Sequence, residues 1–241
     1  MNKKNINEYD WRLQAITTIV EDTISPTGKP IKKGTPVILL HPLKINNRRI
    51  EIYTPSPIAM FLNLSNNYYQ NSLNLFNFKE FKDPRNYNEE QLFNSLECYM
   101  ASIIFAYTAV ETFSNYSIPN NYEFKKLRED KKCLETYDKE EIEKNIKLDL
   151  KIDCILPGIY KVSTFKGTFL WENYLSLKKI RDRIIHLKSK DTKYDLKDPC
   201  NHLWNDLINN GELINYTKKA KEIIEYFYSD KKPRWLIKCP F

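Results

Sequence analysis

The sequence is poor in glycine, with five glycines in 241 residues. Because these glycines are scattered, the chain can form neither the phosphate loop of P-loop proteins nor the dinucleotide-binding fingerprint. Leu, Ile, Lys, Glu and Asn are abundant instead, and such a composition favours helices over a β-sandwich or barrel. We therefore expect a mainly α protein.

Cysteine, histidine and long apolar runs are also scarce. The five cysteines include no Cys-x-x-Cys pair, so they indicate neither a disulfide framework nor a zinc site. The three histidines, His41, His186 and His202, are too scattered to form a recognisable set of metal ligands. No segment reads as a signal peptide or a membrane span. We expect no metal or other cofactor, no membrane partner and a cytoplasmic location.

Positive charge is in excess, with a formal net charge of +7. Residues 166–193 contain eight Lys and Arg against three Asp and Glu. A basic cluster of this kind fits a polyanion such as RNA. The alternative is that lysine, which is abundant throughout the chain, serves only solubility.

Turn signals and periodicity divide the chain into three parts. Residues 1–87 are expected to form an N-terminal extension with short strands and a helix over 58–78, broken near Asn66. Residues 88–228 are expected to form a helical bundle, and residues 229–241 a C-terminal tail. Within the bundle, we expect a charged connector over 122–139 and three helices, which start at Asp138 (through Leu150), at Asp198–Pro199 and at Glu212 (through Tyr228).

A long helix is predicted from about Asn88 to Ser117, because apolar residues cover most of its circumference. Glu111 lies among these apolar residues, and a buried carboxylate needs a partner. Glu111 could make an ion pair or a cap interaction near the helix end. Alternatively, it could orient functional groups on a neighbouring helix.

A second helix is predicted from Thr168 to His186, and it carries the candidate functional residues of the chain. Successive helical residues are about 100° apart, so one stripe faces the core: Leu177, Ile180, Ile184 and Leu187. The opposite face combines apolar and polar residues in a way that suggests a second subunit: Leu175, Asp182, Ile185 and His186. Spacing alone favours the alternative that Arg181, Asp182 and His186 are solvated residues on a charged helix.

The segment Arg181-Asp182-Arg183-Ile184-Ile185-His186 resembles the motif of the HEPN superfamily, in which an Arg and a polar residue precede a His by a few positions. Residues 105–115, followed by Ile118-Pro119, are similar to the long helix that precedes the motif helix in such proteins. Residues 137–143 and 155–157 resemble their connectors. The resemblance covers about residues 92–228 and does not reach the N-terminal extension.

The resemblance implies a HEPN-like bundle of four to five helices that forms a homodimer, with a metal-independent RNA endonuclease site where two motifs meet. His186 would transfer protons, and Arg181 would hold the phosphate. Asp182 would orient His186 or Arg181, and Glu111 would help to orient the same two residues. The residues expected to bind RNA are Lys178, Lys179, Arg183 and Lys188. A role in toxin–antitoxin systems or antiviral defence would fit, with an antitoxin or a regulatory protein as a further partner.

A second hypothesis remains open, because one fold can support several functions. A HEPN-like helical module without catalytic activity could bind RNA, a nucleotide or a protein partner. Such a module would tolerate the loss of His186, whereas the nuclease would not.

Overall fold

The computed structural model describes residues 8–25, 28–80, 87–128, 133–191, 200, 202–208, 211–229 and 232–241. Helices dominate these ranges, and the strands form small two-stranded sheets. The expectation of a mainly α protein is confirmed. The chain forms two compact units, Met1–Met60 with Asp230–Phe241, and Phe61–Ser229. The C-terminal tail thus groups with the N-terminal strands, and most of the first helix groups with the bundle.

The first unit is built from antiparallel pairs in which β1 pairs with β4, β2 with β3 and β5 with β6. The strands are β1 (Ile16–Thr18), β2 (Thr23–Ile24), β3 (Pro30–Ile31), β4 (Pro36–Ile38), β5 (Leu40–Ile45) and β6 (Arg48–Tyr53). Asn46 and Asn47 connect β5 to β6 with φ angles of 48° and 61°. Two left-handed residues suit the tight turn of a twisted hairpin, and asparagine tolerates this conformation.

The C-terminal segment of this unit contains α9 (Arg234–Ile237). The Arg234 guanidinium donates hydrogen bonds to the backbone oxygens of Tyr9 (2.6 Å) and Asp10 (2.9 Å). The Trp11 and Phe241 rings meet edge to face, with 5.9 Å between their centroids. These contacts hold the end of the chain against its beginning.

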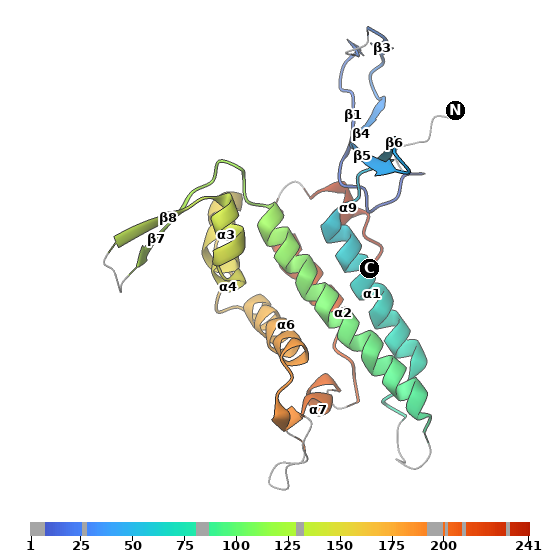
Figure 1. The fold of residues 1–241 in the computed structure, drawn as a ribbon, viewed down its shortest axis with the longest axis vertical. Helices are drawn as coiled ribbons and strands as arrows, with labels where there is room; N and C mark the ends of the chain where they lie inside the picture. The colour runs from blue at the N-terminus through green and yellow to red at the C-terminus, as the bar shows by residue number, and fades with distance from the viewer. Residues whose placement is uncertain are drawn as a thin grey trace. The chain divides into compact units, whose positions relative to one another are not determined.

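The second unit contains the helical bundle (Figure 1). Its helices are α1 (Pro57–Leu75, which starts in the first unit), α2 (Glu89–Tyr116), α3 (Lys139–Asn145), α4 (Leu148–Leu150), α5 (Leu156–Tyr160), α6 (Phe169–Ile185), α7 (Leu203–Leu207) and α8 (Tyr216–Tyr226). A π-helical segment, η2 (Lys151–Ile155), connects α4 to α5, and a 3-10 turn, η3 (Ser189–Asp191), follows α6. No helix in the described ranges is both long and apolar enough to cross a membrane.

Helix α2 is the centre of the bundle and packs against α6 and α8. Asn88 caps its N-terminus by accepting a hydrogen bond from the Gln91 backbone N–H, and Ser117 is its C-terminal cap. Both predicted ends are therefore confirmed. At the junction of α1, α2 and α8, the Ser65 hydroxyl lies 2.6 Å from the Thr217 hydroxyl and donates to the Ser102 backbone oxygen (2.9 Å). This pairing satisfies polar groups that are buried between the helices.

Several predicted boundaries need correction. Helix α1 runs unbroken through Asn66. The helix that Asp138 caps ends at Asn145 and not at Leu150, because Ile146 is extended. The last long helix begins at Tyr216, where Asn215 supplies the cap, and not at Glu212. The start predicted at 198–199 lies outside the described residues.

The predicted connector over 122–139 is wrong, because it contains an antiparallel hairpin. Strands β7 (Phe124–Arg128) and β8 (Cys133–Tyr137) pair, with Leu127 opposite Leu134. Phe124 and Tyr137, at the base of the hairpin, pack against a buried isoleucine cluster. This anchor explains how a charged segment forms strands, since an isolated two-stranded hairpin has little stability of its own.

Asp138→Ala is expected to lower the free energy of unfolding by about 1 kcal/mol. The Asp138 side chain accepts from the Glu141 backbone N–H (2.9 Å), and the Glu141 side chain accepts from the Asp138 backbone N–H (3.0 Å). The substitution removes the Asp138 acceptor, which is one half of this reciprocal capping box. Urea denaturation measures the change, with Glu140→Gln as the control in the same helical turn. A loss as large in the control would show that the cap is unimportant.

Candidate functional site

Helix α6 carries the motif residues and is buried along one stripe. Leu177, Ile180 and Ile184 are buried, as predicted. Leu187 is 49% exposed, so its assignment to the core is wrong. The helix ends at Ile185, and helical spacing therefore no longer applies to Leu187.

His186 is the C-terminal cap of α6. Its backbone N–H donates to the Asp182 backbone oxygen (2.9 Å), and its φ and ψ angles of −118° and 57° take the chain out of the helix. The imidazole is exposed and makes no hydrogen bond or ion pair to any other described residue. A side chain in this position is open to a ligand from solvent.

Arg181 is held on the flank of α6. Its guanidinium carbon lies 3.6 Å from the centroid of the Tyr107 ring on α2, and its Nη1 lies 2.7 Å from Asp182 Oδ1. The Arg181 side chain is 21% exposed. The fold thus brings Arg181 and Asp182 together, but among the described residues no hydrogen bond joins either side chain to the His186 imidazole.

Sequence patterns did not identify two polar contacts of α6, the Tyr107 ring against Arg181 and the Asp149 carboxylate against Tyr174 and Lys178. Burial raises the pKa of Tyr107 to about 12, although the adjacent guanidinium of Arg181 acts in the opposite direction. Tyr174 donates to Asp149 Oδ1 (2.5 Å), and Lys178 lies 2.5 Å from Asp149 Oδ2. Burial and the Asp149 carboxylate raise the pKa of Tyr174 further. Both phenols therefore stay protonated at neutral pH, and the Tyr174 hydroxyl acts as a hydrogen-bond donor to Asp149.

Asp149→Asn is expected to lower stability by about 1 kcal/mol at pH 7, because the ion pair with Lys178 is partly screened by water. Burial acts to raise the pKa of Asp149, but the hydrogen bonds from Lys178 and Tyr174 outweigh it and the pKa lies below its ordinary value. The carboxylate therefore contributes stability above the pKa of the unfolded chain, about 3.9. That stability disappears as the pH falls through the folded pKa.

Urea denaturation of Asp149→Asn and wild type across this pH range tests the expectation. The difference between the two proteins should shrink as the pH falls below about 4. A difference that stays constant from pH 7 to pH 3 would show that the Asp149 charge plays no part.

Of the four residues expected to bind RNA, two have acidic partners within the fold. Lys178 is paired with Asp149, as above. Arg183 lies 2.5 Å from the buried carboxylate of Asp191 and also pairs with Asp206. Lys179 and Lys188 are exposed, and their ammonium groups make no ion pair with any residue that the structure describes. Lys179 and Lys188 are therefore the cations available to a ligand.

A pocket of about 450 Å³ opens beside His186. Asp182, Lys179 and Lys188 line it with His186, and the Arg183–Asp191 pair forms part of its wall. The Asp191 carboxylate also accepts from the Lys188 backbone N–H (3.1 Å) and so anchors the turn that follows His186. The pocket combines an exposed imidazole with two ammonium groups that have no acidic partner among the described residues.

Glu111 is exposed, so the premise that it is buried and needs a partner is wrong. Its charge acts on Tyr107 and Lys151. No hydrogen bond or ion pair joins it to Arg181 or His186 in the described part of the chain. Apolar residues surround α2 so completely that their pattern did not reveal which sector faces solvent.

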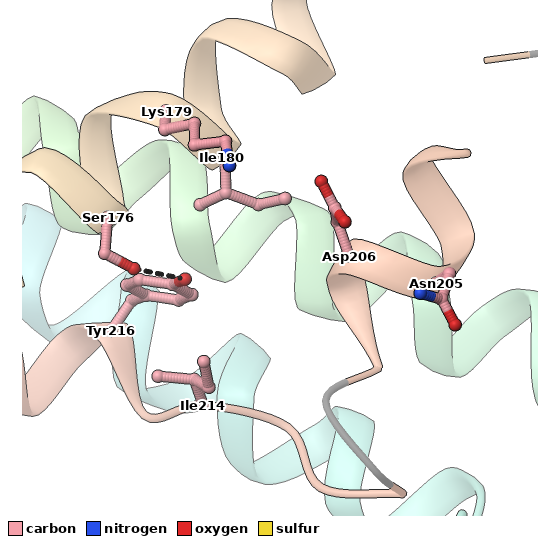
Figure 2. A pocket seen from close by; sticks show the side chains of 7 residues that line it. All are labelled: Ser176, Lys179, Ile180, Asn205, Asp206, Ile214 and Tyr216. Carbon is pink, nitrogen blue, oxygen red and sulfur yellow. Dashed lines mark hydrogen bonds between the residues drawn. The ribbon is translucent and has the colours of Figure 1, made fainter. Parts of the chain in front are cut away.

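Figure 2 shows a second pocket, of about 310 Å³. The residues that line it come from α6, α7 and the start of α8: Ser176, Lys179, Ile180, Asn205, Asp206, Ile214 and Tyr216. The hydroxyls of Ser176 and Tyr216 are 3.0 Å apart. Lys179 lines both pockets, which therefore adjoin.

Comparisons with protein-family models, with curated proteins and with solved structures gave no match. The site must therefore be interpreted from its own geometry.

Proposed function

We propose that the protein is a metal-independent RNA endonuclease of HEPN type. The observation that carries the proposal is the pocket at the end of α6, where an exposed imidazole lies among the ammonium groups of Lys179 and Lys188, which make no ion pair within the described part of the chain. RNA provides the matching chemistry, because its phosphates are anionic and its 2′-hydroxyl is a built-in nucleophile. The net charge of +7 is consistent with a polyanionic substrate.

The chemistry requires two proton transfers and charge stabilisation. A base removes the proton of the 2′-hydroxyl, which attacks the adjacent phosphorus. An acid then protonates the departing 5′-oxygen, which leaves a 2′,3′-cyclic phosphate. Imidazole can perform either transfer near neutral pH. Each chain supplies one motif histidine, so the proposal places two copies of His186 in one cleft of a two-fold dimer.

Arg181 would stabilise the anionic phosphate at this composite site. One of its N–H groups is taken by Asp182, and Tyr107 holds the guanidinium plane. The remaining donors of the planar fork would be available to phosphate oxygens. Tyr107 and Asp182 thus act as positioning residues for Arg181.

Incubating the purified protein with single-stranded RNA in EDTA tests the proposal. The account expects the RNA to be cleaved with no divalent metal present. Intact RNA, or cleavage that requires added Mg²⁺, would contradict it.

Ile185→Asp is expected to convert the dimer to monomers and to reduce cleavage by at least tenfold. Ile185 is 50% exposed on the outer face of α6, so the substitution leaves the core intact. A buried carboxylate at the subunit interface would be strongly unfavourable. Sedimentation velocity measures the oligomeric state, with Leu73→Asp as the control at an exposed apolar position on α1. A variant that stays dimeric would remove α6 from the proposed interface.

One observation favours the second function, a binding module without catalysis. The contacts of Arg181 with Tyr107 and Asp182 are those of a side chain that stabilises the packing of α6 on α2. A binding module would retain RNA affinity in EDTA without cleaving it, and affinity would fall when Lys179 and Lys188 are both changed to Gln. The cleavage assay and a filter-binding assay on the same samples separate the two functions.

A further inference from the structure

The second pocket is lined mainly by polar side chains, with Ile180 and Ile214 as its apolar residues. Figure 2 shows Ile180 and Ile214 on opposite sides of the space, with Ser176 and Tyr216 at one end and Asp206 and Asn205 towards the other. Its volume of about 310 Å³ is at the lower end of the range for small-molecule sites. Two apolar residues within a mainly polar lining leave room for a heterocycle that forms hydrogen bonds at its edge.

The wall between the two pockets is an ion pair. Arg183 lines the His186 pocket, Asp206 lines the second pocket, and the two side chains are paired. This contact holds the Asp206 carboxylate in place through Oδ2. Oδ1 makes no hydrogen bond or ion pair to any described residue. Because each carboxylate oxygen can accept two hydrogen bonds, Oδ1 and the second lone pair of Oδ2 can together accept two donors from a ligand. Lys179, which belongs to both pockets, could bind the phosphate of a nucleotide whose base occupies the second pocket.

We propose that this pocket, defined by Ile180, Ile214, Asn205, Asp206 and Lys179, binds the guanine base of a nucleotide adjacent to the cleaved phosphate. The placement of this guanine next to the cleaved phosphate rests on the RNA-cleaving function proposed above. A carboxylate accepts hydrogen bonds and donates none. Among the four RNA bases, guanine alone presents two adjacent donors, N1–H and N2–H, on its Watson–Crick edge. Adenine, cytosine and uracil each place an acceptor there that would oppose the Asp206 carboxylate.

Calorimetry with guanosine 3′-monophosphate and adenosine 3′-monophosphate tests the proposal without requiring catalysis. Wild type should bind the guanine nucleotide about tenfold more tightly, or better, as expected for a two-donor contact to a carboxylate. Asp206→Asn should remove that preference. The matched control is Glu212→Gln, which removes an exposed carboxylate that is paired with Lys79 outside both pockets; it should keep the preference.

A second variant keeps the proposal testable if Asp206→Asn fails to fold. Asn205 is exposed, and its side chain makes no hydrogen bond to any described residue, so Asn205→Trp should fold and obstruct the pocket. It should weaken binding of the guanine nucleotide by at least tenfold. Equal binding of the two nucleotides, no binding of either, or a preference that survives both substitutions would overturn the proposal.

The two proposals can fail separately. Selective guanine binding that depends on Asp206, in a protein that cuts no RNA, would support the pocket and contradict the nuclease. Cleavage of RNA without a preference for guanine beside the cut would support the nuclease and overturn the pocket.

Discussion

His186→Ala should reduce the rate of RNA cleavage by about 10²- to 10⁴-fold, the usual contribution of a general acid or base. The loss should fall on the chemical step, because Lys179 and Lys188 remain to bind the substrate. His186 is exposed and lies at the end of α6, so its side chain contributes little to packing. RNA affinity and thermal stability should therefore change little.

Initial rates on a defined single-stranded RNA in EDTA measure this effect. The matched control is His41→Ala, which removes an exposed histidine from β5. It should cleave at the wild-type rate. Equal rates for His186→Ala and wild type would show that the activity resides elsewhere or comes from a contaminant.

Arg183→Met should lower the free energy of unfolding by about 3–5 kcal/mol, the cost of removing one partner from a buried ion pair. The side chain of Asp191 is fully buried, and Arg183 is 14% exposed. Without the guanidinium, the Asp191 carboxylate loses its 2.5 Å contact with Arg183 Nη2, and Asp206 loses its contact with Arg183 Nη1. The turn after His186 should loosen as well, because Asp191 anchors the Lys188 backbone N–H.

Urea denaturation measures the free energy of unfolding of Arg183→Met and of the control Lys179→Met, each relative to wild type. Both substitutions remove a basic residue from α6, but Lys179 is exposed and should change stability by no more than about 0.5 kcal/mol. If Arg183→Met were as mild as the control, the pair with Asp191 would not stabilise the fold.

The sequence was most informative where one helix presented a continuous pattern. Helix α2 begins after Asn88 and ends before Ser117, as expected, because the apolar residues between them are uninterrupted by glycine or proline. Helix α6 begins after Thr168 and ends before His186 for the same reason. The burial of Leu177, Ile180 and Ile184 followed from their spacing alone.

Prediction failed where tertiary contacts decide the outcome. The β7–β8 hairpin has charged strands with exposed Leu127 and Leu134, so periodicity gave no sign of it. Asp149 is distant in sequence from Lys178, and no local pattern could indicate that it would receive hydrogen bonds from α6. The partners of Arg183 likewise became visible only in the fold.

The most direct test of the central claim is mass spectrometry of the RNA ends produced in EDTA, with a matched substrate that carries one 2′-deoxy nucleotide at the cut. The account predicts 2′,3′-cyclic phosphate and 5′-hydroxyl ends from the all-RNA substrate, and no cut at the 2′-deoxy position, because the attacking hydroxyl is missing there. The same ends should be absent with His186→Ala. A 5′-phosphate end, or cleavage at the 2′-deoxy position, would contradict the account.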